Sequence, residues 1–436
     1  MKSSQKEIFF FGFFLLLSFN IFSCKFIDKN IKFKSFVDDD EIVTITTDDE
    51  FQLVDAIEEL NEKGGTIYID TPVINMYKTT SVTIGGRFPG GIIGIRQSNG
   101  EYPRINFQEN YRDELFFSGI NIYGSNKFIE YMIIENSLSY GITVIGDSNI
   151  LDHVISRYNY GSGIVVYGDF NTLNYCYSYR NCDANQYSVT ADGFQILGEQ
   201  NNVFNYCFAW DNSNNGFNYV RIFNSSELSY LHSGSWNNGN IHVFTGKYDY
   251  DNGDPLDKNL WTIQEIIQSD PNFVSNYYNK KFSIDDAFLE KMPVNEWISY
   301  VSPKMEGDGF TFGNKNSSQS IDVKRNSLYN VAFDHRGGGF IDRYSHKYNA
   351  YVVSCAGFNN GINFRLPYTF SKWSDNWSWG GKSPDQLSSS VSTQKPKNVN
   401  THVRSFYTVR DQIIKAVTAN MFPDGINFDR VIGLLN

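Results

Sequence analysis

Residues 128–149 read FIEYMIIENSLSYGITVIGDSN, and residues 151–171 repeat the same plan as LDHVISRYNYGSGIVVYGDFN. Each copy has a short alternating run, a polar turn rich in Asn and Gly, a second short apolar run that starts near a Gly, and another turn with Asn. The plan continues through residues 173–202, 204–226 and 228–244. A spacing of roughly 20–30 residues per unit is typical of solenoid repeats.

Units this short cannot bury a core alone, so they must stack on their neighbours. Because strands and turns alternate without helices between them, the pattern predicts an all-β parallel β-helix solenoid with Val, Ile, Tyr and Phe stacked inside. Asn side chains at equivalent turns are expected to form hydrogen-bonded ladders. Cys176 and Cys207 occupy matching positions in LNYCYSYRN and FNYCFAWDN, which predicts that they lie inside on adjacent coils.

A helix is predicted ahead of the repeats, at residues 48–65. This segment reads DDEFQLVDAIEELNEKGG, with Asp48 or Asp49 available as the N-cap, an apolar face, and two glycines at the end. The segment TIYI that follows directly reads as a strand. The helix is expected to be an N-terminal cap that covers the first coil and blocks edge pairing.

The repeat breaks between about 247 and 304, where a partly helical insertion is expected beside the solenoid. Coil-like segments resume over residues 307–366. A loop rich in Ser, Lys and Trp is expected over 367–400, and a final short helix over 411–422.

The N-terminus resembles a secretory signal, because a basic start precedes a short apolar run that ends in Ser-Cys. A Cys at this point is typical of the lipobox of bacterial lipoproteins; an ordinary signal peptide with a chance Cys is the alternative. The sequence therefore predicts a signal peptide at 1–23, lipidation at Cys24, a tether at 24–46 and a β-helix domain at 47–436. The predicted location is the bacterial cell envelope, with a lipid anchor as the only membrane contact.

Composition narrows the class of partner. The 436-residue chain has a net charge of -11 and a pI of about 5.1, which argues against nucleic acid as a partner. Aromatic residues are abundant, with Phe 36, Tyr 28 and Trp 7. The 5 cysteines lack the paired spacing of a metal site, so the internal ones are predicted to be small buried apolar residues.

An ordered series of motifs resembles the family-nine polysaccharide lyases, a pectate-lyase family built on a right-handed parallel β-helix. The series comprises NCDANQYSVTADGFQI at 181–196, NVFNYCFAWDNSNNGFNY at 202–219, GSWNNG at 234–239, GDGFTFGN at 307–314 and YNVAFDHRGGGFIDR at 329–343. The resemblance covers most of the chain after about residue 60. It implies β-elimination on a uronate polysaccharide, with a lysine as base and calcium to stabilise the charge that develops on the substrate carboxylate.

Matching the motifs position by position gives an altered site. The family's first calcium aspartate matches Asp192, but its DDGxD segment is replaced by Asn214, Asn215 and Asn218 around a Gly-Phe pair. The catalytic lysine of its GxGFKxGG motif is replaced by Thr311. An Asn oxygen can bind calcium but carries no charge, so the resemblance implies at most a weak, degenerate calcium site.

Other charged residues fall near the implied cleft. Asp183 and Asp308 are candidates for substrate binding or for capping turns. Arg336 and Arg343 are candidates to bind a uronate carboxylate, with solvated surface positions as the alternative. Lys304, Lys315 and Lys347 lie near the same motifs and, like the two arginines, are candidates for another base or for binding a uronate carboxylate.

Two functions stay open from the sequence. The first is a secreted carbohydrate-active protein that resembles pectate lyases, with the standard calcium and lysine catalysis in doubt. The second is a non-catalytic glycan-binding or adhesive surface lipoprotein, in which exposed aromatics would stack on sugar rings. A β-helix glycoside hydrolase is disfavoured, because the adjacent acid pairs fall outside the coils. The sequence therefore leaves enzymatic activity undecided.

Overall fold

The computed structural model describes part of the chain, and all of that part belongs to the compact unit Asp38–Asn436. The described residues are 41–107, 119–137, 139–159, 161–181, 191–198, 200–220, 227–239, 242–244, 260–262, 307–313, 324–342, 349–366, 370–387 and 410–415. Among them no helix is long and apolar enough to cross a membrane.

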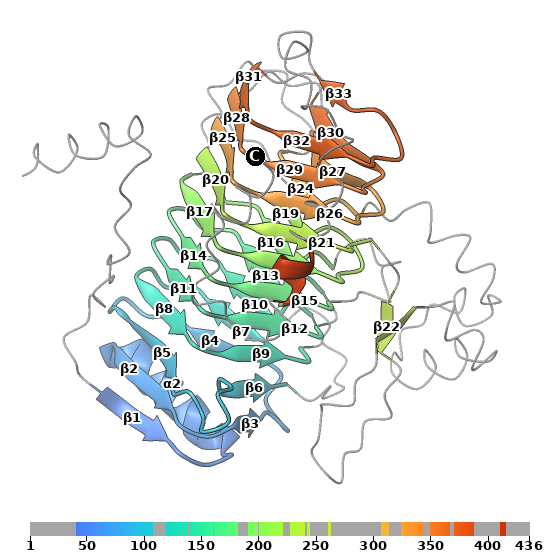
Figure 1. Ribbon diagram of the computed structural model, residues 1–436. Helices are drawn as coiled ribbons and strands as arrows, with labels where there is room; N and C mark the ends of the chain where they lie inside the picture. The colour runs from blue at the N-terminus through green and yellow to red at the C-terminus, as the bar shows by residue number, and fades with distance from the viewer. Residues whose placement is uncertain are drawn as a thin grey trace, which may run out of the picture. The chain divides into compact units, whose positions relative to one another are not determined.

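Three parallel sheets run side by side through the stacked coils (Figure 1). Sheet A has 11 strands: β1 Glu41–Ile45, β2 Gly65–Ile69, β5 Gly90–Gly94, β8 Lys127–Glu130, β11 Ile150–Asp152, β14 Thr172–Asn174, β17 Asn202–Asn205, β20 Glu227–Leu231, β25 Lys324–Leu328, β28 Asn349–Val353 and β31 Phe370–Ser374. Sheet B has 10 strands: β3 Val73–Asn75, β6 Arg104–Asn106, β9 Ile133–Glu135, β12 Ile155–Arg157, β15 Tyr177–Tyr179, β18 Phe208–Trp210, β21 Gly234–Trp236, β26 Val331–Phe333, β29 Ala356–Phe358 and β32 Trp377–Trp379.

Sheet C carries the candidate site and also has 10 strands: β4 Val82–Ile84, β7 Ile120–Ile122, β10 Ile142–Val144, β13 Ile164–Val166, β16 Phe194–Ile196, β19 Phe217–Tyr219, β24 Phe310–Thr311, β27 Gly338–Ile341, β30 Ile362–Leu366 and β33 Gln386–Leu387. Equivalent residues of successive coils are paired, as in Ile120, Ile142 and Ile164. Each full coil thus contributes one strand to each sheet, and the predicted parallel β-helix is confirmed.

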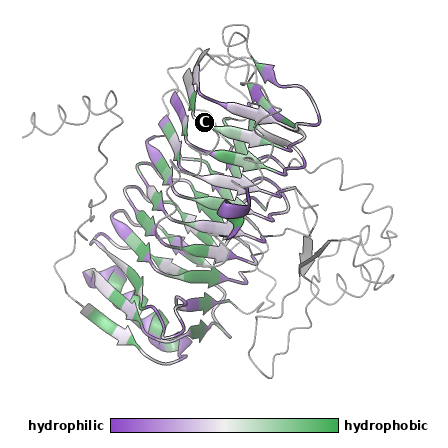
Figure 2. Cartoon of the chain, viewed as in Figure 1, coloured by the Kyte–Doolittle hydropathy of each residue, from purple (hydrophilic) through white to green (hydrophobic). Residues whose placement is uncertain are grey.

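The interior is a continuous apolar column, because alternate residues of each strand point inward. Hydrophobic and hydrophilic residues accordingly alternate along the strands in Figure 2. In sheet C the inward column includes Phe194, Phe217, Phe310, Phe340 and Phe364, whose rings stack with centroids 4.6 to 5.2 Å apart. Stacking of like rings on successive coils fixes their register and accounts for part of the aromatic excess.

A second ring stack follows the bend between sheets A and B. From Tyr131 onward each residue of the stack has a left-handed backbone, with φ between 49° and 58°. Neighbouring rings lie 4.7 to 5.4 Å apart along Tyr102, Tyr131, His153, Tyr175, Tyr206, His232 and Tyr329. Left-handed conformations are costly for large side chains, and the repeated ring contacts offset part of that cost.

The predicted N-terminal helix forms as α2, Glu50–Lys63, capped by the Asp49 side chain and ended at Gly64. Leu53, Ile57 and Leu60 are buried in the same cluster as the solenoid interior. The helix therefore covers the apolar end of the first coils, as expected.

The boundary between tether and solenoid is corrected by the structure. The range expected for the tether, 24–46, includes β1, which pairs in parallel with β2. Ile45 is fully buried in the interior cluster, so residues 41–45, at least, belong to the solenoid and not to the tether. The strand EIVTI has only five residues and comes before the helix, apart from the repeats, so the sequence pattern did not indicate it. The signal peptide and Cys24 lie outside the described residues.

Two further expectations are corrected. The segment expected as a loop over 367–400 contains β31, β32 and β33, and two of its three tryptophans, Trp373 and Trp377, are buried, each 6% exposed. In the expected helical insertion, β23 (Leu260–Thr262) forms an antiparallel pair with β22 (His242–Phe244). The rest of the insertion lies outside the described residues. Of the predicted final helix, 411–422, residues 411–415 are helical and the helix begins one residue earlier, at 410; residues 416–422 lie outside the described residues. Ile413 is buried against the outer face of sheet B.

The internal cysteines that the structure describes are free thiols. Cys176, Cys207 and Cys355 are all buried. Because Tyr177 pairs with Phe208, Cys176 and Cys207 lie on adjacent coils, as predicted. Cys182 lies outside the described residues.

Candidate functional site

The Asn residues near sheet C are of two kinds, one structural and one in the candidate site. One kind forms the predicted ladder at the turn between sheets B and C, where each side-chain nitrogen donates to the Oδ1 of the next Asn. The ladder runs through Asn159, Asn181, Asn212 and Asn238, with distances of 2.9 to 3.0 Å. These residues hold successive coils together, so Asn212 is structural.

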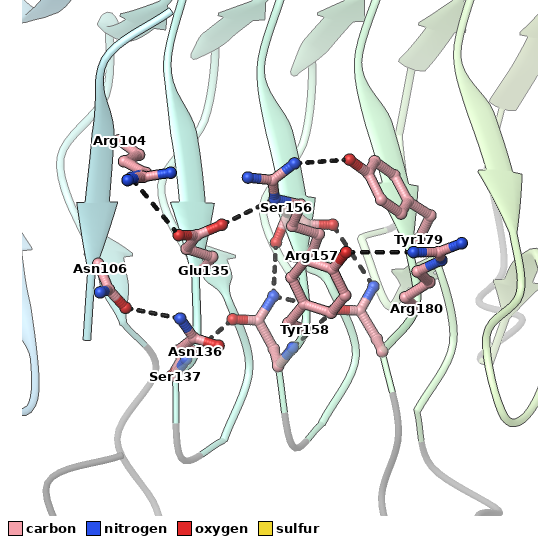
Figure 3. A network of polar contacts seen from close by, with 12 residues as sticks. Arg104, Asn106, Glu135, Asn136, Ser137, Ser156, Arg157, Tyr158, Tyr179 and Arg180 are labelled. Carbon is pink, nitrogen blue, oxygen red and sulfur yellow. Dashed lines mark hydrogen bonds and ion pairs between the residues drawn. The ribbon is translucent and has the colours of Figure 1, made fainter. Parts of the chain in front are cut away.

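Toward the N-terminus a separate Asn pair, one turn position earlier and with the opposite donor direction, lies next to a charged network (Figure 3). Asn136 donates to Asn106 over 2.6 Å. Beside it, the buried carboxylate of Glu135 is paired with Arg157 at 2.7 Å and lies 3.9 Å from Arg104. Burial of a charge is tolerated when it is paired and hydrogen-bonded, and this network accordingly serves the fold.

The second kind of Asn gathers around Asp192. Asp192 precedes β16, Asn214 and Asn215 precede β19, and Asn218 lies in β19, one coil further on. Thr311, at the end of β24, lies on the coil after that, since Phe217 pairs with Phe310. The residues that the resemblance grouped together are therefore neighbours on the outer side of sheet C.

The carboxylate of Asp192 is fully buried and surrounded by donors. Its Oδ1 accepts from Asn214 Nδ2 at 2.8 Å and from the backbone N–H of Asn215 at 3.0 Å. Its Oδ2 accepts from Asn218 Nδ2 at 2.8 Å. Both oxygens of the carboxylate are thus occupied by N–H groups of the chain itself.

Thr311 completes this network. Its Oγ1 accepts from the Tyr219 backbone N–H at 2.9 Å, so its own proton is donated to Asn218 Oδ1 at 3.1 Å. Asn218 therefore presents its oxygen to Thr311 and its nitrogen to Asp192, which fixes the orientation of its amide. Thr311 is buried, with 1% of its surface exposed, and its hydroxyl makes both of these hydrogen bonds.

Asp308 lies on the same coil as Thr311 and caps a turn. Its Oδ1 accepts from Gly338 N at 2.6 Å, and its backbone N–H donates to Asn215 Oδ1 at 2.8 Å. Burial raises the pKa of Asp308 to about 7, with the nearby Asp192 acting in the same direction and Arg365 opposing it. Of its two predicted roles, turn capping is the one that its contacts display.

The residues present do not fit a calcium ion. Protein calcium sites are built from oxygens, often with several carboxylates, whereas Asn214 and Asn218 direct their Nδ2 groups at the single carboxylate of Asp192. The described part of the chain also holds no group of three or more His, Cys, Asp and Glu that could bind a metal. An amide–carboxylate network fills the place that the resemblance gives to calcium.

The remaining predicted residues divide into two groups. Arg336 is exposed, and its backbone N–H donates to Asn238 O on the preceding coil. Asp183, Arg343, Lys304, Lys315 and Lys347 lie outside the described residues. The sequence interpretation missed Arg365, which is exposed in β30 and interacts electrostatically with Asp308. Only the register, which pairs Ile341 with Arg365, reveals this neighbour.

Three parallel sheets, an N-terminal capping helix and an altered lyase motif series define the class: a right-handed parallel β-helix protein of the polysaccharide-lyase type. Residues 37–254, half of the chain, match the family model described as "Pel9A-like, right handed beta helix region". The chain belongs to this Pel9A-like family.

Solved structures support the same fold. The crystal structure of pectate lyase Pel9A is 16% identical with a TM-score of 0.55, over 81% of this chain and 79% of that one. A rhamnogalacturonan lyase is 13% identical with a TM-score of 0.54, over 79% of this chain and 84% of that one. No curated protein matches the chain. At these identities the similarity shows the fold and does not show the activity.

Proposed function

We propose that this protein binds a polysaccharide on a lyase scaffold and does not carry out calcium-dependent β-elimination. The observation that carries the proposal is the closed network around Asp192, in which both carboxylate oxygens accept hydrogen bonds from Asn214, Asn215 and Asn218. A calcium ion would have to displace these donors and would meet one negative charge there.

The position of the base supports the same conclusion. β-Elimination needs a group that accepts the proton next to the uronate carboxylate, and an alcohol has no useful basicity near neutral pH. The Thr311 oxygen already accepts from Tyr219 and donates to Asn218. The Thr311 proton and one of its two lone pairs are therefore already used within the network.

The polymer is proposed to contain uronate residues. The two structural relatives are described as a pectate lyase and a rhamnogalacturonan lyase. Arg336 and Arg365 are exposed on coils that follow Thr311. A guanidinium suits a carboxylate because it donates two parallel hydrogen bonds, so these arginines are the proposed contacts for a uronate.

Two readouts on one protein test the proposal. In native gels that contain polygalacturonate, the wild-type chain should be retarded, and Arg336→Gln with Arg365→Gln should reduce the retardation. Incubation with polygalacturonate, with and without calcium, should give no rise in the ultraviolet absorbance of unsaturated ends. A calcium-dependent rise would overturn the loss of catalysis, and absence of retardation would overturn the binding function.

We further propose that the chain is exported and anchored by a lipid at Cys24, as the signal-like N-terminus predicts. Metabolic labelling with palmitate in a bacterial host should mark the wild-type chain but not Cys24→Ser. Release of an unlabelled wild-type protein into the medium would contradict the anchor.

A further inference from the structure

Most large aromatics are accounted for by the interior and the ring stacks, but a few are not. Tyr123, Ile145 and Tyr167 are 57%, 37% and 41% exposed, and they lie on successive coils. We call these three residues the turn stripe. Neither tyrosine ring has a stacking partner or a hydroxyl hydrogen bond within the described part of the chain. Single exposed apolar residues are ordinary, but an aligned row of them is not.

The turn stripe is held in register by the backbone. Each residue directly follows a strand of sheet C, and its N–H still donates to the preceding coil. The acceptors are Ile84 O for Tyr123 (2.9 Å), Ile122 O for Ile145 (2.7 Å) and Val144 O for Tyr167 (2.7 Å). Since neighbouring parallel strands are about 4.8 Å apart, the tyrosines on alternate coils are separated by roughly 9.5 Å.

A column of glycines keeps the turn rigid. Gly124, Gly146 and Gly168 follow the stripe residues one by one. A Cβ on Gly146 would lie 2.0 Å from Gly124 O, and one on Gly168 would lie 2.0 Å from Gly146 O. The turns are therefore packed backbone on backbone, and the stripe is presented in a fixed arrangement that needs little ordering on binding.

The stripe lies on the outer face that carries the candidate site. Side chains two residues apart on a strand share a face, so Leu197 extends the stripe on the coil of Asp192, and Val220 extends it on the coil of Asn218. Their N–H groups donate to Val166 O and Ile196 O at 2.7 and 2.9 Å, in the same register. A chain-like ligand along the stripe would lead directly to the candidate site.

The flanks of the stripe are polar, with carboxylates in the turns after Ile145 and Tyr167 and a cation, Arg87, in the equivalent turn of the preceding coil. Asp147 accepts from Asp169 N at 2.7 Å, and Ser125 accepts from Asp147 N at 3.3 Å, so these side chains line the same turns. Lys127, on the strand after the first turn, is buried with its ammonium on Phe88 O. Arg87 lies at the turn before Tyr123, with its guanidinium over the Phe88 ring.

We propose that the turn stripe binds neutral sugar residues of a polysaccharide chain by stacking of Tyr123 and Tyr167 on sugar rings. A row one side chain wide, between hydrogen-bonding turns, fits a linear glycan better than the broad apolar patch of a protein interface. The carboxylates of Asp147 and Asp169 disfavour uronates beside Ile145 and Tyr167. The proposal rests on polysaccharide binding as the function of the chain. It adds a second contact region, which prefers neutral sugars where Arg336 and Arg365 prefer uronates.

The test compares variants of the full chain in native gels that contain galactan, arabinan, a soluble glucan or polygalacturonate. Tyr123→Ala combined with Tyr167→Ala should weaken binding about tenfold for whichever of the three neutral polymers the wild-type chain binds. The matched Phe variant should retain it. Tyr351→Ala is the control, because Tyr351 is 38% exposed on sheet A. Retardation by polygalacturonate through Arg336 and Arg365 should change little.

Three results would overturn the stripe: no binding to any neutral polymer, no effect of the double Ala variant, or an equal effect of Tyr351→Ala. A change of oligomeric state in the double variant, measured by light scattering, without a change in glycan binding would identify a protein interface instead. Because polygalacturonate binding is read separately, failure of the stripe is distinguishable from failure of the proposed function.

Discussion

Asn218 donates from its amide nitrogen to Asp192 over 2.8 Å while its oxygen accepts from Thr311 over 3.1 Å. This relationship joins the two changed motifs into one unit. Thr311, which the resemblance matches to the lysine, holds the amide of Asn218, which the resemblance matches to a calcium aspartate. The two altered motifs thus form one hydrogen-bonded structure.

Restoring carboxylates should restore metal binding. Asn214→Asp with Asn218→Asp replaces two donors by acceptors beside Asp192. Without calcium the like charges should lower the free energy of unfolding by about 3 kcal/mol. Titration calorimetry should detect calcium binding to this variant and none to the wild type. Asn174→Asp with Asn205→Asp, on sheet A, adds the same charge elsewhere and should bind no calcium; calcium binding by the unmodified chain would refute the closed network.

The Thr311 hydroxyl should be worth more than an ordinary surface hydroxyl. Thr311→Val leaves Tyr219 N and Asn218 Oδ1 without their partner, so the free energy of unfolding should fall by about 2 kcal/mol. Thr311→Ser should recover most of this loss. Thr172→Val, at a partly exposed position of β14, should change it by less than about 0.5 kcal/mol in urea unfolding. Equal effects of the two Val variants would contradict the network.

Asp308 should make stability fall as the pH rises. Its pKa is about 7 in the folded chain, raised by burial from 3.8. Between these values the unfolded chain has lost the proton that the folded chain retains, so unfolding becomes easier with each unit of pH. Asp308→Asn mimics the protonated form and should gain stability relative to wild type as the pH rises from about 4 to about 7. Urea unfolding across that range measures the difference, with Asp147→Asn as the exposed control; parallel curves would reject the shift.

His335 should act in the opposite direction. It replaces an Asn in the ladder, where its Nδ1 accepts from Asn238 N at 3.3 Å, and burial lowers its pKa from 6.5 to about 3. As the pH falls through this window the unfolded chain takes up a proton first, so stability is lost. His335→Asn with Ala332→Ser recreates the pair seen at Ser235 and Asn238. This variant should lose less stability on acidification than wild type, as measured by urea unfolding at low pH. The same loss of the free energy of unfolding in both chains would show that His335 does not contribute.

The glycine column should tolerate no side chain. Gly146→Ala places a Cβ 2.0 Å from Gly124 O, whereas a Cβ on Gly85 would have no neighbour closer than 4.0 Å. Gly146→Ala should therefore lower the free energy of unfolding by about 3 kcal/mol, and Gly85→Ala should leave it nearly unchanged. Comparable losses from both would show that the coils adjust more freely than their packing indicates.

Much of the fold followed from local pattern. Alternation at 128–171 predicts strands because one face of each must be buried, and the repeated Asn and Gly mark the turns. The helix over 48–65 carries its own cap and stop signals, so it was also predictable. Where the pattern was weak the prediction failed. The segment that forms β31 and β32, with its buried tryptophans, was predicted as a loop, and the segment that forms β1 was predicted as part of the tether.

For the site, the sequence by itself determined, through its resemblance to the lyases, that Asp192 is kept while Asn214, Asn215, Asn218 and Thr311 stand at positions of charged motif residues. Only the tertiary structure decided what they do together, because the direction of an amide depends on partners from other coils. The same holds for the aromatics. Ring type is local, but whether Phe217 stacks inside or Tyr167 faces solvent is set by the register of one coil on the next, which arises only when the coils stack.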